Sequence, residues 1–138
     1  MPAASVVRKV LDTFAVMALF NGEAGADQVE DLLFRASQGK LELMMATVNL
    51  GEVWYCIARA ASPESADYYT DELMALSIEL IDADWSLTRA AAAIKVRGNL
   101  SYADSFAAAL AKLHGVALVT GDHEFKQLED EIVIEWLA

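Results

Sequence analysis

The chain alternates short apolar runs with stretches in which apolar residues recur every three or four positions. The runs rich in Val, Ile and Leu predict strands at residues 6–11, 41–46, 78–81, 116–120 and 132–135. The helical spacing predicts helices at 13–20, 26–37, 48–61, 63–77, 85–96 and 102–114, and a short helix at 123–128. Strands that alternate with helices indicate an α/β domain with a largely parallel sheet.

Polar residues and glycines at the ends of these segments agree with the predicted boundaries. Thr47, Asp84 and Ser101 each stand where a helix N-cap is expected, and the ring of Pro63 suits a first helical position. Gly115 follows the 102–114 helix at the place of a left-handed C-terminal cap. We therefore expect one domain over residues 1–138, since that length is typical of a single core.

The balance of charges narrows the possible functions. With Lys+Arg 10 against Asp+Glu 21, the net charge is −11, and a field of this sign repels nucleic acid. Simple non-specific nucleic-acid binding is therefore disfavoured unless bound cations neutralise some of the acids or a basic partner docks. The hydrophobic content of 56% leaves some apolar surface for a partner to cover.

The cysteine content and the N-terminal segment bear on location. Cys56 is the single cysteine, and a small buried hydrophobe is its simplest role, which favours a reducing compartment. Residues 8–26 resemble a secretory signal, but Asp12 interrupts the apolar run, which is also too short to cross a bilayer. We expect a cytoplasmic protein without a membrane segment.

Four acidic residues fall at positions from which they can converge. Asp12 ends the first predicted strand and Asp122 follows the fourth, and open α/β sheets bind ligands outside the carboxyl ends of their strands. Glu52 and Asp104 lie in the first turns of helices that begin near the same edge. Clustered carboxylates repel one another unless cations lie between them, and Mg²⁺ and Mn²⁺ prefer oxygen ligands. Such ions hydrolyse phosphodiesters without a protein nucleophile, so the pattern indicates a metal-dependent nuclease.

Each acid also has a structural interpretation that stays open at this point. Asp104 stands three residues after Ser101, as in a capping box, and Asp122 after a glycine suits a turn. Glu52 can face solvent, and Asp12 can cap the helix that follows it. An acid inside an apolar run is usually paired, metal-bound or capping, which makes Asp12 the most informative of the four.

Four ordered sequence strings together carry a family resemblance. They are VLDT at 10–13, VNLGEV at 48–53, LSYADSF at 100–106 and LVTGD at 118–122. The set resembles the PIN-domain family over about residues 7–137, and most closely its VapC-type toxins from bacterial toxin–antitoxin pairs. The resemblance implies a three-layer α/β/α fold with a parallel, twisted sheet of four to five strands. It also implies an Mg²⁺- or Mn²⁺-dependent endoribonuclease, an antitoxin partner and a homodimer.

The resemblance assigns roles to individual residues. It places metal ligands and catalysis at Asp12, Glu52, Asp104 and Asp122. Three further residues match or neighbour supporting positions: Thr13, Thr120 and Glu124. Capping and strand-end hydrogen bonding explain the two threonines equally well. His123 departs from the proline that relatives often carry there, and we expect it to be exposed.

Other residues are candidates for contact with RNA. Four cations near the expected site form a possible basic rim, or are ordinary solvated charges: Arg89, Lys95, Arg97 and Lys126. Tyr102 and Trp85 are candidates for base stacking, although aromatic residues at helical spacing usually belong to the core.

Three other functions fit part of the pattern. The chain can be a PIN-domain nuclease that processes RNA without being a toxin. It can be a phosphatase or phosphotransfer protein in which Asp12 is the nucleophile, although no suitably placed lysine supports that chemistry. It can also be an inactive binding module, against which the four retained acids argue.

Overall fold

A computed structural model describes residues 6–138. Five parallel strands form one sheet in the order β3-β2-β1-β4-β5. The strands are β1 (Val7–Leu11), β2 (Leu41–Ala46), β3 (Ile78–Ile81), β4 (Ala117–Thr120) and β5 (Ile134–Trp136). The helices are α1 (Thr13–Asn21), α2 (Ala26–Ser37), α3 (Thr47–Ala60), α4 (Pro63–Met74), α5 (Trp85–Lys95), α6 (Tyr102–His114) and the 3-10 helix η1 (His123–Leu128).

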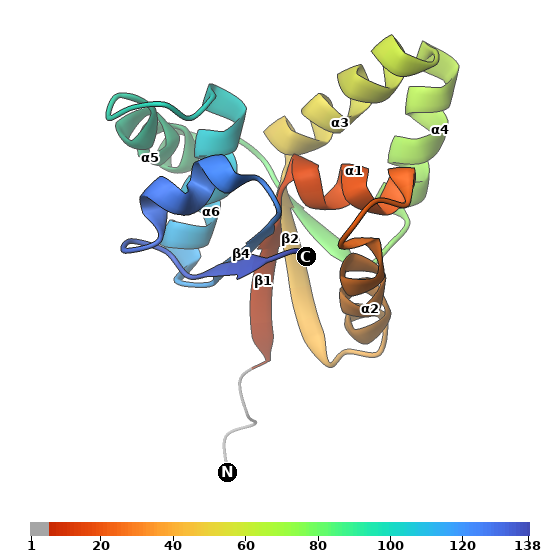
Figure 1. The fold of residues 1–138 in the computed structure, drawn as a ribbon, viewed down its shortest axis with the longest axis horizontal. Helices are drawn as coiled ribbons and strands as arrows, with labels where there is room; N and C mark the ends of the chain where they lie inside the picture. Colours follow the sequence, from red (N-terminus) through yellow and green to blue (C-terminus); the bar gives the residue numbers. More distant parts are fainter. Residues whose placement is uncertain (1–5) are drawn as a thin grey trace.

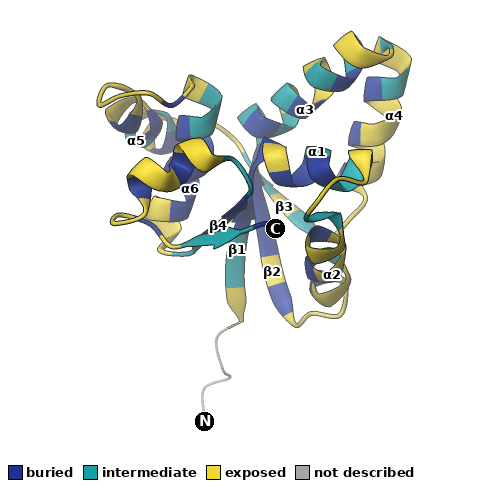
Figure 2. Ribbon diagram, in the orientation of Figure 1, coloured by how far each residue is buried: buried dark blue, intermediate teal, exposed yellow. Residues whose placement is uncertain are grey.

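Helices cover both faces of this sheet (Figure 1). Successive side chains of a strand point to opposite faces, so Leu43 and Met45 of β2 pack with α1–α4 while Met44 packs with α5 and α6. The central strands β2 and β4 and the last residues of β1 are largely buried, the edge strands β3 and β5 are half-buried, and the helices expose their outer sides (Figure 2). This is the three-layer α/β/α arrangement that the family resemblance implies, and the sheet, which the sequence predicts to be largely parallel, has only parallel pairings.

The strand order fixes where a ligand can bind. From β1 the chain crosses to β2 on one side, and β4 later pairs with β1 on the other side. The two flanking connections leave β1 and β4 in opposite directions, and the carboxyl ends of such strands border a crevice. Asp12 directly follows β1, and Asp122 follows β4 after one intervening glycine.

Two details of the element boundaries correct the sequence prediction. Thr47 is the first residue of α3 and not its cap, because α3 begins directly after β2 and no side chain caps it. Thr47 instead donates from Oγ1 to the carbonyl of Ile81, at 3.5 Å. The last strand is Ile134–Trp136 and not 132–135, since the preceding buried Ile132 belongs to the turn that closes η1.

The N-terminal apolar run folds into the central strand β1 and helix α1. Among residues 6–138 no helix has the length and apolar character needed to cross a bilayer.

Candidate metal centre at the carboxyl edge of the sheet

Asp12 is a buried carboxylate held by two hydrogen bonds. Its side chain is the N-cap of α1, where Oδ1 accepts from the backbone N–H of Ala15 at 2.9 Å. Oδ2 accepts from the hydroxyl of Thr120 at 2.5 Å, and the residue is only 1% exposed. The capping and site roles that the sequence left open for Asp12 are therefore compatible, since both oxygens are fixed and the carboxylate stays at the end of β1.

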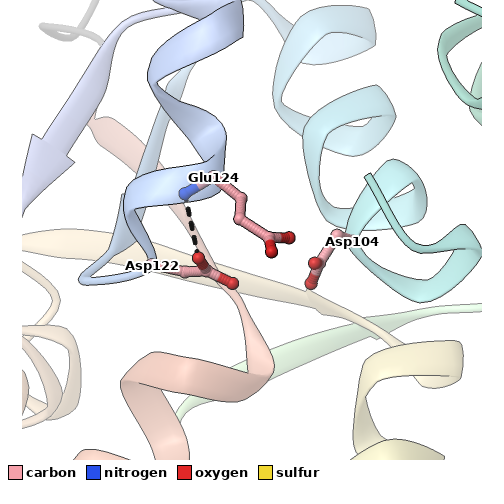
Figure 3. A group of neighbouring side chains, drawn as sticks. All are labelled: Asp104, Asp122 and Glu124. Atoms are coloured by element: carbon pink, nitrogen blue, oxygen red, sulfur yellow. Dashed lines mark hydrogen bonds between the residues drawn. The ribbon is translucent and has the colours of Figure 1, made fainter. Parts of the chain in front are cut away.

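Three further carboxylates meet beside this position (Figure 3). Asp104 comes from the first turn of α6, Asp122 from the loop after β4 and Glu124 from η1. Each offers one oxygen, and these oxygens all lie within 4.8 Å of one another. Local capping produces this geometry: Ser101 Oγ accepts from Asp104 N at 3.1 Å, and Asp122 Oδ1 accepts from Glu124 N at 3.0 Å.

Burial and the charges of neighbouring acids raise the pKa values of two of these carboxylates. Burial raises the pKa of Asp12 to about 7 against the opposing hydrogen bonds from Thr120 and Ala15, and the charges of Asp104 and Asp122 raise it further. Burial likewise raises the pKa of Asp104 to about 6, with contributions from the charge of Asp122 and, more weakly, of other nearby acids. Within residues 6–138 no lysine or arginine forms an ion pair with these carboxylates.

Glu52 lies near these acids but outside the group of three. It is half-buried on α3, and its Oε2 accepts from the hydroxyl of Tyr55 at 3.2 Å. Its charge contributes to the raised pKa of Asp104, so the two carboxylates are close enough to interact. The group of acids whose oxygens lie within 4.8 Å of one another therefore contains Glu124 and not Glu52, although the charge of Glu52 acts on Asp104 at least as strongly as that of Glu124.

The two predicted supporting threonines have different contacts. Thr120 is fully buried and joins two acids, because its Oγ1 donates to Asp12 and accepts from Asp122 N at 3.0 Å. Thr13 donates from Oγ1 to the carbonyl of Asn49 at 3.2 Å, and so ties α1 to α3. Thr120 therefore contacts the acids directly, whereas Thr13 positions the helices that carry them.

Sequence reasoning missed Asn49 and the packing around Gly121. Asn49 is fully buried, and its Nδ2 donates to the carbonyl of Ala103 at 2.9 Å, which links α3 to the start of α6. An amide among the apolar residues of α3 was the available signal. The ring of Phe14 packs on Gly121, where an added Cβ would lie 2.3 Å from Phe14 Cε1.

Comparison with known families identifies the fold around these acids. The PIN domain family matches residues 9–131, a span that includes every acid described above. The chain belongs to the PIN domain family. No curated protein matches it significantly in sequence.

Solved structures with the same fold come from several bacteria. VapBC2 from Rickettsia felis, bound to a DNA fragment from its promoter, matches with 18% identity and a TM-score of 0.75, covering 96% of this chain and 100% of that chain. DNA-bound VapBC from Salmonella typhimurium has 19% identity and a TM-score of 0.70, covering 94% and 98%. Mycobacterium tuberculosis VapC20, described as a Sarcin-Ricin loop cleaving toxin, has 18% identity and a TM-score of 0.67, covering 86% and 93%.

The acids of this PIN domain fit a divalent cation. The donor set consists only of carboxylate oxygens, which hard ions such as Mg²⁺ and Mn²⁺ prefer. The raised pKa values of Asp12 and Asp104 express an electrostatic cost that a bound cation relieves. Both histidines are exposed, so a zinc site built on buried imidazoles does not fit this chain.

One residue of the predicted basic rim, Arg97, forms an ion pair with a carboxylate. Arg97 Nη1 lies 2.9 Å from Glu131 Oε1, and the ammonium of Lys112 lies 3.0 Å from the same oxygen. Arg89, Lys95 and Lys126 are exposed, and Lys126 lies on η1 two residues after Glu124. The two aromatic candidates are also exposed, Tyr102 at 45% and Trp85 at 73%.

Proposed function

We propose that this PIN domain is an Mg²⁺- or Mn²⁺-dependent endoribonuclease that hydrolyses RNA phosphodiester bonds. The observation that carries the proposal is the meeting of Asp104, Asp122 and Glu124 next to buried Asp12, at the carboxyl ends of β1 and β4. A site of this composition attracts hard cations and offers no histidine or cysteine nucleophile of its own. Phosphodiester hydrolysis is the reaction that such a carboxylate site supports best.

Asp12, Glu52, Asp104 and Asp122 would hold the cation, and Glu124 adds a fifth carboxylate next to Asp104 and Asp122. A divalent ion bound there supplies polarisation of the phosphate and activation of water. The protein contributes fixed geometry, because Thr120 holds Asp12 and the Asp122 backbone in one arrangement. Asn49 and Ser101 fix the start of α6, which carries Asp104. Catalysis of this kind depends on such preorganisation.

Within this proposal the protein is the cytoplasmic toxin of a toxin–antitoxin pair. The similarity in fold to VapBC proteins over nearly the whole chain supports that role. The net charge of −11 suits an antitoxin whose basic segment enters the acidic site, since an arginine among carboxylates gains charge-assisted hydrogen bonds. A homodimer is part of the same proposal, and light scattering of the purified chain measures it.

The decisive experiment measures cleavage of total RNA by the purified chain with Mg²⁺, with Mn²⁺ and with a chelator. We expect cleavage only with a divalent ion, and a loss of at least about 100-fold in Asp104→Asn, as is typical when a group that stabilises the transition state is removed. Asp130→Asn is the matched control, because Asp130 is an exposed acid outside the cluster. Cleavage by Asp104→Asn at the rate of the control would refute the proposal.

Two of the alternative functions predict different results. A phosphotransfer role predicts that Asp12 becomes phosphorylated on incubation with a phosphodonor, whereas a metal-dependent nuclease predicts that it does not. A PIN-domain nuclease that is not a toxin cleaves RNA in vitro, yet its expression without a partner leaves growth unaffected. Growth arrest by the wild type, but not by Asp104→Asn, supports the toxin role.

A further inference from the structure

An aromatic stack stands directly beside the acidic cluster. His123 lies between Asp122 and Glu124 in the chain, and its ring stacks on Trp136 with centroids 5.8 Å apart and planes 24° apart. Trp136 is half-buried against the core on the α5–α6 side. In the sheet register it pairs with Thr120, whose hydroxyl bonds Asp12. The stack is therefore tied to the same strand ends as the site.

The imidazole ring of His123 has a stacked aromatic partner and belongs to a solvent-exposed residue. The indole of Trp136 covers one face, and the residue as a whole is exposed to solvent. A half-buried partner on a strand limits the orientations that an exposed ring adopts. A flat ring held in this way can stack on an unpaired nucleobase. Stacking needs an accessible face of the base and depends little on which base it is.

We propose that the imidazole of His123, held by Trp136, is the stacking platform for a nucleobase adjacent to the phosphate that binds at the acids. This proposal rests on the proposed function and deepens it. It makes the substrate an unpaired segment of RNA, because a base inside a duplex has both faces covered. The phosphate and the base of one nucleotide are joined by a single sugar, and the chain neighbours of His123 are two acids of the cluster, Asp122 and Glu124.

Stacking also answers the electrostatic problem of an acidic nuclease. Stacking contributes affinity without requiring positive charge on the protein. This chain has Lys+Arg 10 against Asp+Glu 21. Stacking tolerates different bases, so His123 determines a preference for unpaired over paired RNA and not for one sequence. No covalent chemistry is assigned to the imidazole.

The test compares adenosine 5′-monophosphate with ribose 5-phosphate in the presence of Mg²⁺. The two ligands share the phosphate and the sugar and differ by the base, and neither contains a phosphodiester bond to be cleaved. We expect the nucleotide to bind roughly 5- to 100-fold more tightly, in line with base–aromatic stacking. NMR titration locates the bound nucleotide. The ring signals of His123 should shift, while those of His114, at the C-terminal end of α6, should not change.

Three variants complete the test. His123→Ala should bring the ratio of the two affinities close to one, and His123→Tyr should retain most of it. Tyr68→Ala is the matched control, since Tyr68 is an aromatic residue of α4 with 60% exposure. Equal affinities for the two ligands in the wild type, no binding of either ligand, or an unchanged ratio in His123→Ala would overturn the proposal. RNA cleavage is measured separately, so failure of the nuclease proposal and failure of the stacking proposal are distinguishable.

Discussion

Replacement of Asp12 by asparagine should make the metal-free protein more stable at neutral pH while it abolishes activity. The side chains have nearly the same shape, and asparagine is an equally good helix N-cap. Its Oδ1 still accepts from Ala15 N, and its amide donates to the Thr120 hydroxyl in place of accepting from it. The main change is therefore the removal of a buried negative charge.

The size of the gain follows from the raised pKa of Asp12. Between the ordinary value of 3.8 and about 7, each pH unit corresponds to 1.36 kcal/mol, which gives about 4 kcal/mol for the full interval. The folded state holds the proton more tightly than the unfolded chain, so the wild type loses stability as pH rises from about 4 to 7. Above pH 7 the free energy of unfolding of the wild type has fallen by the full amount. Asp12→Asn does not carry this charge, so at pH 8 it should unfold at a temperature roughly 12 °C higher than the wild type.

Urea denaturation in a chelating buffer at pH 5.5 and pH 8 measures this difference. The advantage of Asp12→Asn should grow by about 2 kcal/mol between the two pH values, since only the part of the interval above pH 5.5 contributes. Mn²⁺ should then stabilise the wild type but have little effect on the variant. Asp130→Asn should behave as the wild type in both buffers. An Asp12→Asn protein less stable than the wild type at pH 8 without metal would refute the reasoning, because hydrogen bonding and not charge would then dominate.

Three further predictions concern the residues that position the acids. Gly121→Ala places a methyl group against the exposed ring of Phe14, which has to turn aside, so unfolding measurements should show a loss of about 0.5–1.5 kcal/mol, and the loss should be smaller in a Phe14→Ala background. Asn49→Ala removes the amide that holds the start of α6 and leaves a buried carbonyl unpaired, so it should cost about 1–3 kcal/mol in urea unfolding and weaken Mn²⁺ binding in calorimetry. Ser101→Ala loses an N-cap worth about 1 kcal/mol and a hydrogen bond that lowers the pKa of Asp104, so the acidic limb of the pH–rate profile should move to higher pH.

Much of the fold can be predicted from the sequence because its central strands β2 and β4 are largely buried. Such strands appear as continuous apolar runs, and the second predicted strand matches β2 at both ends. One error occurs where an element begins directly after another, and a second occurs where a turn contains a buried apolar residue, Ile132. Thr47 resembles a cap by residue type, yet β2 ends at the preceding residue and leaves no space for one.

The candidate site can be predicted in part. Strand ends place Asp12 and Asp122 at one edge of a parallel sheet, and this follows from the apolar pattern alone. The direction of side chains on helices does not follow from linear spacing, so the sequence gives no reason to prefer Glu124 over Glu52 as the third member of the cluster. Contacts between distant segments are equally hidden, as with Asn49, whose acceptor lies on another helix.

The surroundings of His123 show the same limit. Its exposure is predicted correctly, but its stacking depends on the register of β5 against β4, which places Trp136 beside Thr120. The short apolar run at 132–135 does not determine that register. The aromatic neighbour of the acidic cluster is therefore visible only in the folded structure.

The distribution of cations explains how an acidic chain can act on an anionic substrate. Several of its Lys+Arg 10 already pair with carboxylates: Arg8, Lys9, Arg35, Arg97 and Lys112. Under the proposed function, so few free cations do not make a basic surface that attracts RNA, and we expect the affinity to come from ions bound at the acids and from uncharged contacts. Binding in which few protein cations neutralise phosphates releases few counterions, so the affinity for RNA at constant Mg²⁺ should change little with monovalent salt. A steep salt dependence would indicate that a basic surface, and not the acidic edge of β1 and β4, dominates substrate binding.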